Sequence, residues 1–164
     1  MTASTPLTVL GPAAFARAWA ELLAQAPPLW WMCAERFDDW PLEDPGVAEA
    51  LVAWSRHQTQ GEVRVFAREF GWVERYGARF MQWRRLFAHQ VQVRRWPQRL
   101  PDAQGLPRGV LQPRAAVLIG AAVPVGQLEA RISVEAGPIG VALQTLGTAW
   151  DMGQPALPAH TLGL

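Results

Sequence analysis

The segment RFMQWRRLFAHQVQVRRW, residues 79–96, carries the side chains of this sequence that are best suited to bind an anion. It contains five arginines, two tryptophans and one histidine. Arginine binds phosphate oxygens through bidentate hydrogen bonds, and indole rings can stack on unpaired bases. One hypothesis is therefore a surface that binds a phosphate-bearing ligand or a nucleic acid. Its candidate residues are Arg84, Arg85, Arg94, Arg95 and His89.

The distribution of charge offers a second explanation of these arginines. Residues 56–114 hold twelve arginines and four acids, whereas residues 1–55 hold two arginines and seven acids. A basic region can attract an anionic partner. The same arginines can instead pair with the acidic first third of the folded chain, or cover apolar edges of the core. We favour the second explanation, because the arginines of the helix expected at 72–89 border its apolar stripe and do not form one patch.

The basic residues are all arginine, which excludes two classes of chemistry. Because the chain has no lysine, it can form neither a Walker-type phosphate loop nor a Schiff base. It also lacks the G-x-S-x-G segment of a nucleophilic serine and the G-x-G-x-x-G segment of a dinucleotide site. We therefore expect no cofactor.

Two histidines could act as the general base of an enzyme of unrecognised type. His57 or His89 would need a carboxylate to orient its ring and a pocket for the substrate. Both are expected at helix C-termini, where the helix dipole favours a partly charged imidazole. This structural role accounts for both side chains, so we predict no catalytic residue and keep the enzyme as an alternative.

An acidic cluster near the start of the chain could bind a divalent cation through oxygen ligands. Its spacing is not that of an EF-hand loop, and Trp40 and Pro41 interrupt it. Asp44 before Pro45 instead predicts a helix N-cap followed by the first helical residue. We therefore predict no metal site. The acids of the cluster are Glu35, Asp38, Asp39, Glu43 and Asp44.

Cys33 is the one cysteine of the chain, which excludes an intrachain disulfide and a C-x-x-C metal site. It lies at the end of a buried apolar run, where a cysteine is usually inert. A reactive thiolate would need a cationic neighbour, and Arg36 is near in sequence.

Hydrophobic periodicity predicts the elements that position these residues. Apolar residues at helical spacing indicate four helices, at 11–25, 45–57, 72–89 and 138–150. Short apolar or alternating runs indicate five strands, at 29–33, 62–67, 90–96, 115–121 and 129–137. Four prolines predict that residues 97–114 form a long loop or a strand-edge excursion.

This order of elements predicts an α/β fold, with a layered sheet of mostly parallel strands flanked by helices. We expect an N-terminal helical segment packed on the domain at 1–27, the α/β domain at 28–152 and an extended C-terminal tail at 153–164. The nine tryptophans are assigned mainly to packing. No apolar run reaches the roughly 18 residues of a membrane span, and we expect a cytoplasmic protein of a bacterium.

The middle of the chain resembles a known domain. The order LVAWSRHQTQGEVRVFARE, then GARFMQWRRLFAHQVQVRRW, is similar to a bacterial domain of unknown function, which itself resembles a single half of the phospholipase D fold. The resemblance covers residues 28–152 and includes a later strand, AAVLIGA, and a closing helix, LQTLGTAWDMG. Active members of that superfamily carry His-x-Lys followed four residues later by Asp. Histidine attacks phosphorus and lysine holds the phosphate oxygens.

That signature is missing from this chain. Two residues after His57, His89 and His160 stand Thr59, Val91 and Leu162. The resemblance therefore implies a degenerate copy without a phosphodiesterase site of that type. It also implies a homodimer, because halves of this fold usually pair around their site.

We therefore expect a non-catalytic binding or interaction module. The alternatives are binding of nucleic acid or a phosphate ligand through the arginine-rich middle, and an enzyme that uses His57 or His89.

Overall fold

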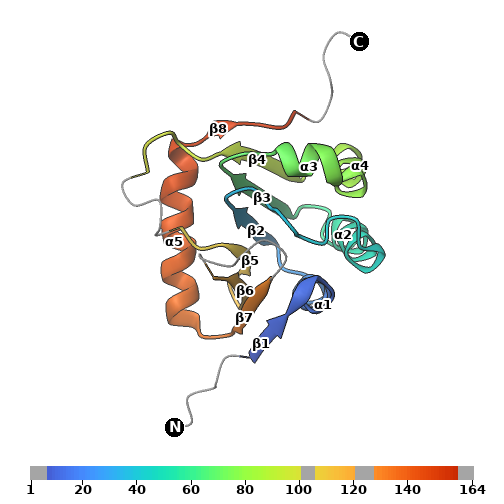
Figure 1. The fold of residues 1–164 in the computed structure, drawn as a ribbon, viewed down its shortest axis with the longest axis horizontal. Coiled ribbons are helices and arrows are strands. Elements are labelled where there is room, and N and C mark those ends of the chain that lie inside the picture. The colour runs from blue at the N-terminus through green and yellow to red at the C-terminus, as the bar shows by residue number, and fades with distance from the viewer. Residues whose placement is uncertain (1–6, 101–105, 121–127, 159–164) are drawn as a thin grey trace.

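A computed structural model describes residues 7–100, 106–120 and 128–158 of the chain (Figure 1). In these ranges eight strands form one sheet in the order β1-β7-β6-β5-β2-β3-β4-β8. The strands are β1 (Leu7–Leu10), β2 (Leu29–Ala34), β3 (Glu62–Ala67), β4 (Val91–Arg95), β5 (Gly109–Gln112), β6 (Ala115–Ile119), β7 (Glu129–Ser133) and β8 (Gln154–Pro155). The helices are α1 (Gly11–Ala24), α2 (Pro45–His57), α3 (Gly71–Tyr76), α4 (Ala78–Leu86) and α5 (Ala136–Met152).

The sheet lies between two layers of helices, as the α/β prediction requires. Figure 1 shows α5 along one face and the helices α1 to α4 along the other. The larger apolar core fills the space between the sheet and α1, α2 and α4, whereas a smaller core packs under α5. Eight of the nine tryptophans are buried in these cores, which confirms their assignment to packing. They are Trp19, Trp30, Trp31, Trp40, Trp54, Trp83, Trp96 and Trp150.

The prediction of mostly parallel strands was wrong. Only β2, β3 and β4 run parallel to one another, and the five other neighbouring pairs are antiparallel. Helices α2, α3 and α4 connect the three parallel strands, because a parallel pair needs a long crossover. Strands β5 and β6 instead form a hairpin in which Gln112 pairs with Ala115. The chain therefore reverses direction between these two strands, and they are antiparallel.

Strand β5 explains most of this error. It lies inside the segment 97–114, whose prolines predict a long loop or a strand-edge excursion and not a strand within the sheet. Gly109 opens the strand with a φ of +141°, and a Cβ atom there would lie 1.9 Å from the backbone oxygen of Val117. Glycine is thus required where β5 approaches β6. Strand β1 was also missed by the sequence analysis.

The predicted helix at 72–89 is two helices. Gly77 has the non-helical angles φ −116° and ψ 42° and separates α3 from α4. A Cβ atom at Gly77 would lie 2.7 Å from the backbone oxygen of Val73. The break divides the apolar stripe, so Phe80 is buried while Tyr76 is 51% exposed.

Local sequence signals placed the other elements well. Asp44 caps α2, and its Oδ1 accepts a hydrogen bond from the backbone N–H of Val47 at 3.1 Å. Strand β3 has the predicted bounds, and α1 begins and buries its apolar face as expected. No helix in the described ranges is long and apolar enough to cross a membrane. The predicted tail falls partly on residues 159–164, outside the described residues.

Candidate anion-binding site at the strand ends

Three segments of the chain meet at the edge where the parallel strands β2 and β3 end. The register pairs Ala34 with Ala67, the last residues of the two strands. Because parallel strands end on the same side of a sheet, the residues that follow them are neighbours. Strand β5 runs antiparallel to β2 and pairs Gly109 with Cys33. The residue before β5, Arg108, therefore reaches the same edge from the opposite direction.

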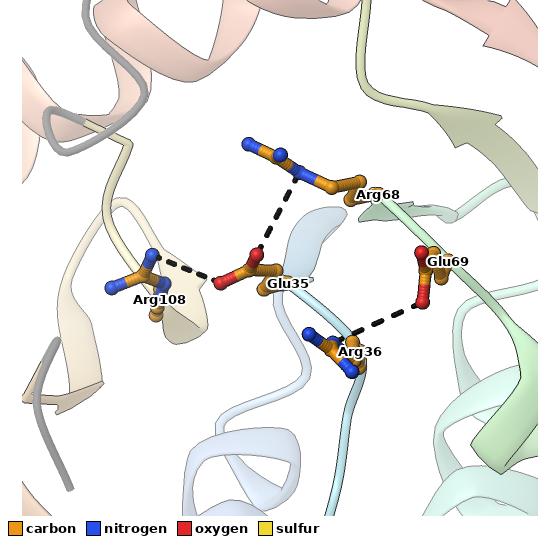
Figure 2. A network of polar contacts seen from close by, with 5 residues as sticks. All are labelled: Glu35, Arg36, Arg68, Glu69 and Arg108. Atoms are coloured by element: carbon orange, nitrogen blue, oxygen red, sulfur yellow. Dashed lines mark ion pairs between the residues drawn. The ribbon is translucent and has the colours of Figure 1, made fainter.

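Five charged residues form a cluster here, which we call the edge cluster (Figure 2). They are Glu35 and Arg36 after β2, Arg68 and Glu69 after β3, and Arg108 before β5. Three arginines against two glutamates leave an excess of one positive charge. The edge cluster is thus a basic site assembled from segments that are far apart in the sequence.

Glu35 lies between two of the arginines. Its Oε1 is 3.7 Å from Nε of Arg68, and its Oε2 is 3.6 Å from Nη2 of Arg108. In the neighbouring pair, Nε of Arg36 is 3.9 Å from Oε2 of Glu69. These separations exceed the 2.7–2.9 Å or so of a short charge-assisted hydrogen bond. The guanidinium groups of Arg36 and Arg68 can therefore give N–H donors to another anion.

The backbone under the edge cluster is fixed. The carbonyl oxygen of Glu35 accepts the backbone N–H groups of Arg68 at 3.0 Å and of Glu69 at 3.1 Å. The guanidinium of Arg68 lies 5.4 Å from the centre of the Trp96 ring, a cation–π arrangement. The loops after β2 and β3 are consequently joined, and one arginine rests on a buried aromatic side chain.

The loop that leaves β2 is strained. Phe37 and Asp39 adopt positive φ angles of 61° and 63°, a region that residues with a Cβ atom rarely occupy. Strain of this kind concentrates at functional sites. It flanks the edge cluster directly, which adds to the case for this edge as the functional one.

Cys33 lies beneath the edge cluster and is fully buried. Burial raises the pKa of the Cys33 thiol to about 12. The thiol is therefore protonated at neutral pH and packs as an apolar side chain, as we expected.

The structure does not bring the predicted ligand-binding residues together. Arg84 is buried in α4, and its guanidinium donates long hydrogen bonds of 3.4 Å to the carbonyl of Leu157 and 3.5 Å to that of Ala88. Burial lowers the pKa of Arg84. Arg94 projects from β4 toward α5, where it donates to the carbonyl of Trp150. Both guanidinium groups thus have partners within the fold.

The remaining candidates Arg85, Arg95 and His89 are exposed. Ligand binding by Arg84, Arg85, Arg94, Arg95 and His89 stays a prediction. His57 is the last residue of α2, and together with alanines of α1 and α2 it lines a hollow of about 360 Å³. In the described part of the chain, neither His57 nor His89 forms an ion pair with a carboxylate.

The acidic first third does pair with the basic middle. Glu35 lies near two arginines, and Glu43 contacts Nε of Arg79 at 3.6 Å and also accepts its backbone N–H at 2.8 Å. No group of three or more potential metal ligands occurs among the described residues. The acids predicted as structural thus have arginine or backbone partners at Glu35, Glu43 and Asp44.

None of the three arginines of the edge cluster is among the ligand-binding residues predicted from the sequence. Arg36 follows a buried strand by two residues, a position that signals an active edge in a parallel sheet. Arg108 had no signal, because the strand that it precedes was interpreted as a loop. Arg68 directly follows β3 and was within reach of the same argument as Arg36.

No protein-family model matches this chain, and no curated protein matches it. Several solved structures are similar to it, among them Nuc and TrmBL2. Nuc from Salmonella typhimurium, a phospholipase D family member, superposes with a TM-score of 0.56 at 13% identity, over 94% of this chain and 100% of its own. The fold of this chain is therefore similar to that of a phospholipase D family member. The expected fold resemblance is therefore confirmed, whereas degeneracy of the site stays a prediction.

Another similar structure is that of TrmBL2, an archaeal chromatin protein, which shows a novel mode of DNA binding by that protein. It superposes with a TM-score of 0.62 at 9% identity, over 92% of this chain and 54% of its own. This chain thus spans about half the length of TrmBL2. At such identities both likenesses concern the fold.

Proposed function

We propose that this chain is a non-catalytic binding module for a phosphate-bearing ligand, with a degenerate phospholipase D-like fold. The observation that carries the proposal is the convergence of Arg36, Arg68 and Arg108 at the edge where β2 and β3 end. Ligands of open α/β sheets bind outside the carboxyl ends of the parallel strands. Three guanidinium groups at that position favour an anion.

Phosphate is the anion that fits best. Arginine presents a planar fork of N–H donors that matches two phosphate oxygens at once, and it keeps its charge at any physiological pH. The ion pairs within the edge cluster are long and partly exposed to solvent, since the side chains of Arg68 and Arg36 are 49% and 57% exposed. Such pairs contribute little stability, so a ligand can replace them at low cost.

The edge cluster binds without reacting. Arginine can hold a phosphate group but cannot attack phosphorus or take a proton at neutral pH. The thiol beneath it, Cys33, has no solvent exposure and a pKa of about 12. The missing His-x-Lys signature supports the same conclusion.

The test is calorimetric titration of the protein with inorganic phosphate at low ionic strength. We expect R68A/R108A to lose about tenfold or more in affinity, since each substitution removes charge-assisted hydrogen bonds. Arg17→Ala, which removes an exposed arginine from α1, is the matched control and should bind as the wild type does. Equal binding by the wild type and R68A/R108A would refute the proposal.

Nucleic-acid binding is a second candidate, which the fold shared with a DNA-binding chromatin protein favours. Its residues are the exposed Arg85 and Arg95, with His89 near them in sequence, and it extends to Arg84 and Arg94 if these leave their present partners. Titration with a fluorescent single-stranded oligonucleotide at two salt concentrations tests it. Binding should weaken steeply with salt and drop in R85A/R95A; salt-independent binding, or none, would exclude it.

A homodimer is part of the same proposal, and several apolar side chains are available to form it. Leu7, Leu10, Leu86, Val134 and Val141 are among the exposed large ones. The solution mass from light scattering decides the point: twice 18.1 kDa supports a dimer, and a single chain mass refutes it.

A further inference from the structure

We infer that Glu35 is a built-in competitor of the ligand, and that this competition makes the edge cluster select phosphate monoesters over phosphodiesters. The inference deepens the function proposed above and depends on it. Glu35, a negatively charged residue inside a basic site, would thus determine which phosphate-bearing ligands bind.

The position of Glu35 is that of a bound anion. Each of its carboxylate oxygens faces a different arginine, Oε1 toward Arg68 at 3.7 Å and Oε2 toward Arg108 at 3.6 Å (Figure 2). The side chain of Arg108 is 17% exposed and that of Glu35 is 39% exposed. A ligand that approaches from solvent therefore meets the carboxylate together with the two guanidinium groups.

Glu35 can give up these contacts by a change of side-chain rotamer. Its backbone stays in place, because its carbonyl oxygen accepts two N–H groups from the start of the neighbouring loop, those of Arg68 and Glu69. Among the described residues, its carboxylate makes two ion pairs, both long and partly exposed, and such pairs contribute little stability. The ligand must therefore displace or outweigh one negative charge, but no part of the fold has to open.

This exchange favours the more highly charged phosphate. A phosphodiester carries a single negative charge, as the Glu35 carboxylate does, and offers two free oxygens, so replacing one by the other gains little. A phosphate monoester carries about −1.5 to −2 at pH 7 and offers three terminal oxygens. A monoester therefore brings more charge and one more free oxygen than the carboxylate to Arg68 and Arg108, the two guanidinium groups that Glu35 contacts.

The test compares methyl phosphate, a monoester, with dimethyl phosphate, a diester, by calorimetric titration. The wild type should bind methyl phosphate about tenfold more tightly. Glu35→Gln keeps the size of the side chain and removes its charge. We expect this variant to bind dimethyl phosphate several-fold more tightly than the wild type does, so that the ratio of the two affinities falls to about threefold or less.

Glu69→Gln is the matched control, since Glu69 pairs only with Arg36 among the arginines of the edge cluster and does not lie between two of them. It should keep the wild-type ratio. Circular dichroism and thermal unfolding of each variant check that the exposed substitutions leave the fold intact.

Three results would overturn the inference. Weaker binding of both esters by E35Q would mean that Glu35 positions the arginines and does not compete. Equal binding of both esters by the wild type would exclude selection. If the ratio of the two ester affinities changes as much in E69Q as in E35Q, the selectivity depends on the total charge of the edge cluster and not on the position of Glu35. Failure of the proposed function is distinct, because R68A/R108A would then bind both esters as the wild type does.

A second arm identifies the source of the phosphate group. The measurement compares the affinities of the wild-type protein for three ligands. They are a 5′-phosphorylated oligonucleotide, the same oligonucleotide with a 5′-hydroxyl, and a sugar phosphate. Tighter binding of the phosphorylated oligonucleotide than of its hydroxyl counterpart supports a nucleic-acid end, and tightest binding of the sugar phosphate supports a small metabolite. Equal binding of the two oligonucleotides would contradict monoester selection.

Discussion

Arg94 joins the sheet to the end of α5 through Trp150. Its Nη1 donates a hydrogen bond to the backbone carbonyl of Trp150 at 2.8 Å, and its guanidinium lies 4.8 Å from the centre of the indole ring. The guanidinium of Arg64 lies over the same ring at 5.5 Å. The carbonyls of a last helical turn lack partners within the helix, and a cation there also complements the helix dipole. Arg94 therefore has a structural role, in addition to any role in binding.

Arg94→Ala should destabilise the protein by about 1–3 kcal/mol, because it removes a charged hydrogen bond and a cation–π contact. The free energy of unfolding in urea measures the effect. Arg95→Ala, which removes the exposed neighbour, is the control and should change stability by about 0.5 kcal/mol or less. Equal effects of the two substitutions would show that the contact with Trp150 adds no net stability.

Gly109→Ala should be among the most damaging small substitutions in the chain. The new Cβ would stand 1.9 Å from the backbone oxygen of Val117 at a φ of +141°, so β5 would have to move away from β6. We expect a loss of about 3 kcal/mol or more. A thermal unfolding curve shows the result as a lower Tm or an unfolded protein at room temperature.

Gly140→Ala provides the opposite case. Gly140 lies within α5, and a Cβ atom there would have no neighbour within 4 Å. Alanine should therefore stabilise the protein by about 0.4–1 kcal/mol, since it restricts the unfolded chain and favours the helix.

A stable G109A protein would mean that the hairpin of β5 and β6 adapts, and the tight approach of the two strands would not be essential.

Most helices and the inner strands could be predicted because their signals are local. Asp44 and Pro45 mark the start of α2, and the apolar run at 62–67 defines β3 within a few neighbouring residues. The relative direction of the strands in the sheet is not determined by local sequence. It depends on β5, whose identity as a strand comes from pairing with β2 and β6 and not from its own short, proline-flanked sequence.

The edge cluster was hard to predict for the same reason. Arg36 and Arg108 are 72 positions apart in the sequence, and only the antiparallel pairing of β2 with β5 brings their segments together. The arginines at 84–95 were more conspicuous because they are dense in sequence. A high density of arginines in the sequence does not mean that their side chains meet in the fold. Arg84 donates to the carbonyl of Leu157, whereas Arg94 donates to that of Trp150.

Cys33 should make the stability of the protein depend on pH in alkaline solution. The thiol has a pKa of about 12 in the folded protein against an ordinary value of 9.0. Between these values the unfolded chain loses a proton that the folded chain retains. The stability associated with Cys33 is therefore fully present below about pH 8.5 and is lost as the pH rises toward 12, by up to about 1.4 kcal/mol per pH unit.

Cys33→Ala isolates this effect. The variant lacks the thiol, so its urea unfolding free energy should fall less steeply between pH 8.5 and 10.5 than that of the wild type, whatever the difference between them at pH 7. Parallel curves for the two proteins would mean that the thiol ionises in the folded state and that its burial is incomplete.

Ser55 and Trp83 link α2 to α4 across the core. The indole Nε1 of Trp83 donates a hydrogen bond to Oγ of Ser55 at 2.9 Å, and both residues are buried. Ser55→Ala would leave this N–H without its acceptor in an apolar environment, which costs about 1–3 kcal/mol. We expect that loss in the free energy of unfolding measured in urea. Ser133→Ala on β7, where the side chain is only partly buried, should cost about 0.5 kcal/mol or less; equal losses in the two variants would mean that the N–H of Trp83 finds a new acceptor when Ser55 is changed.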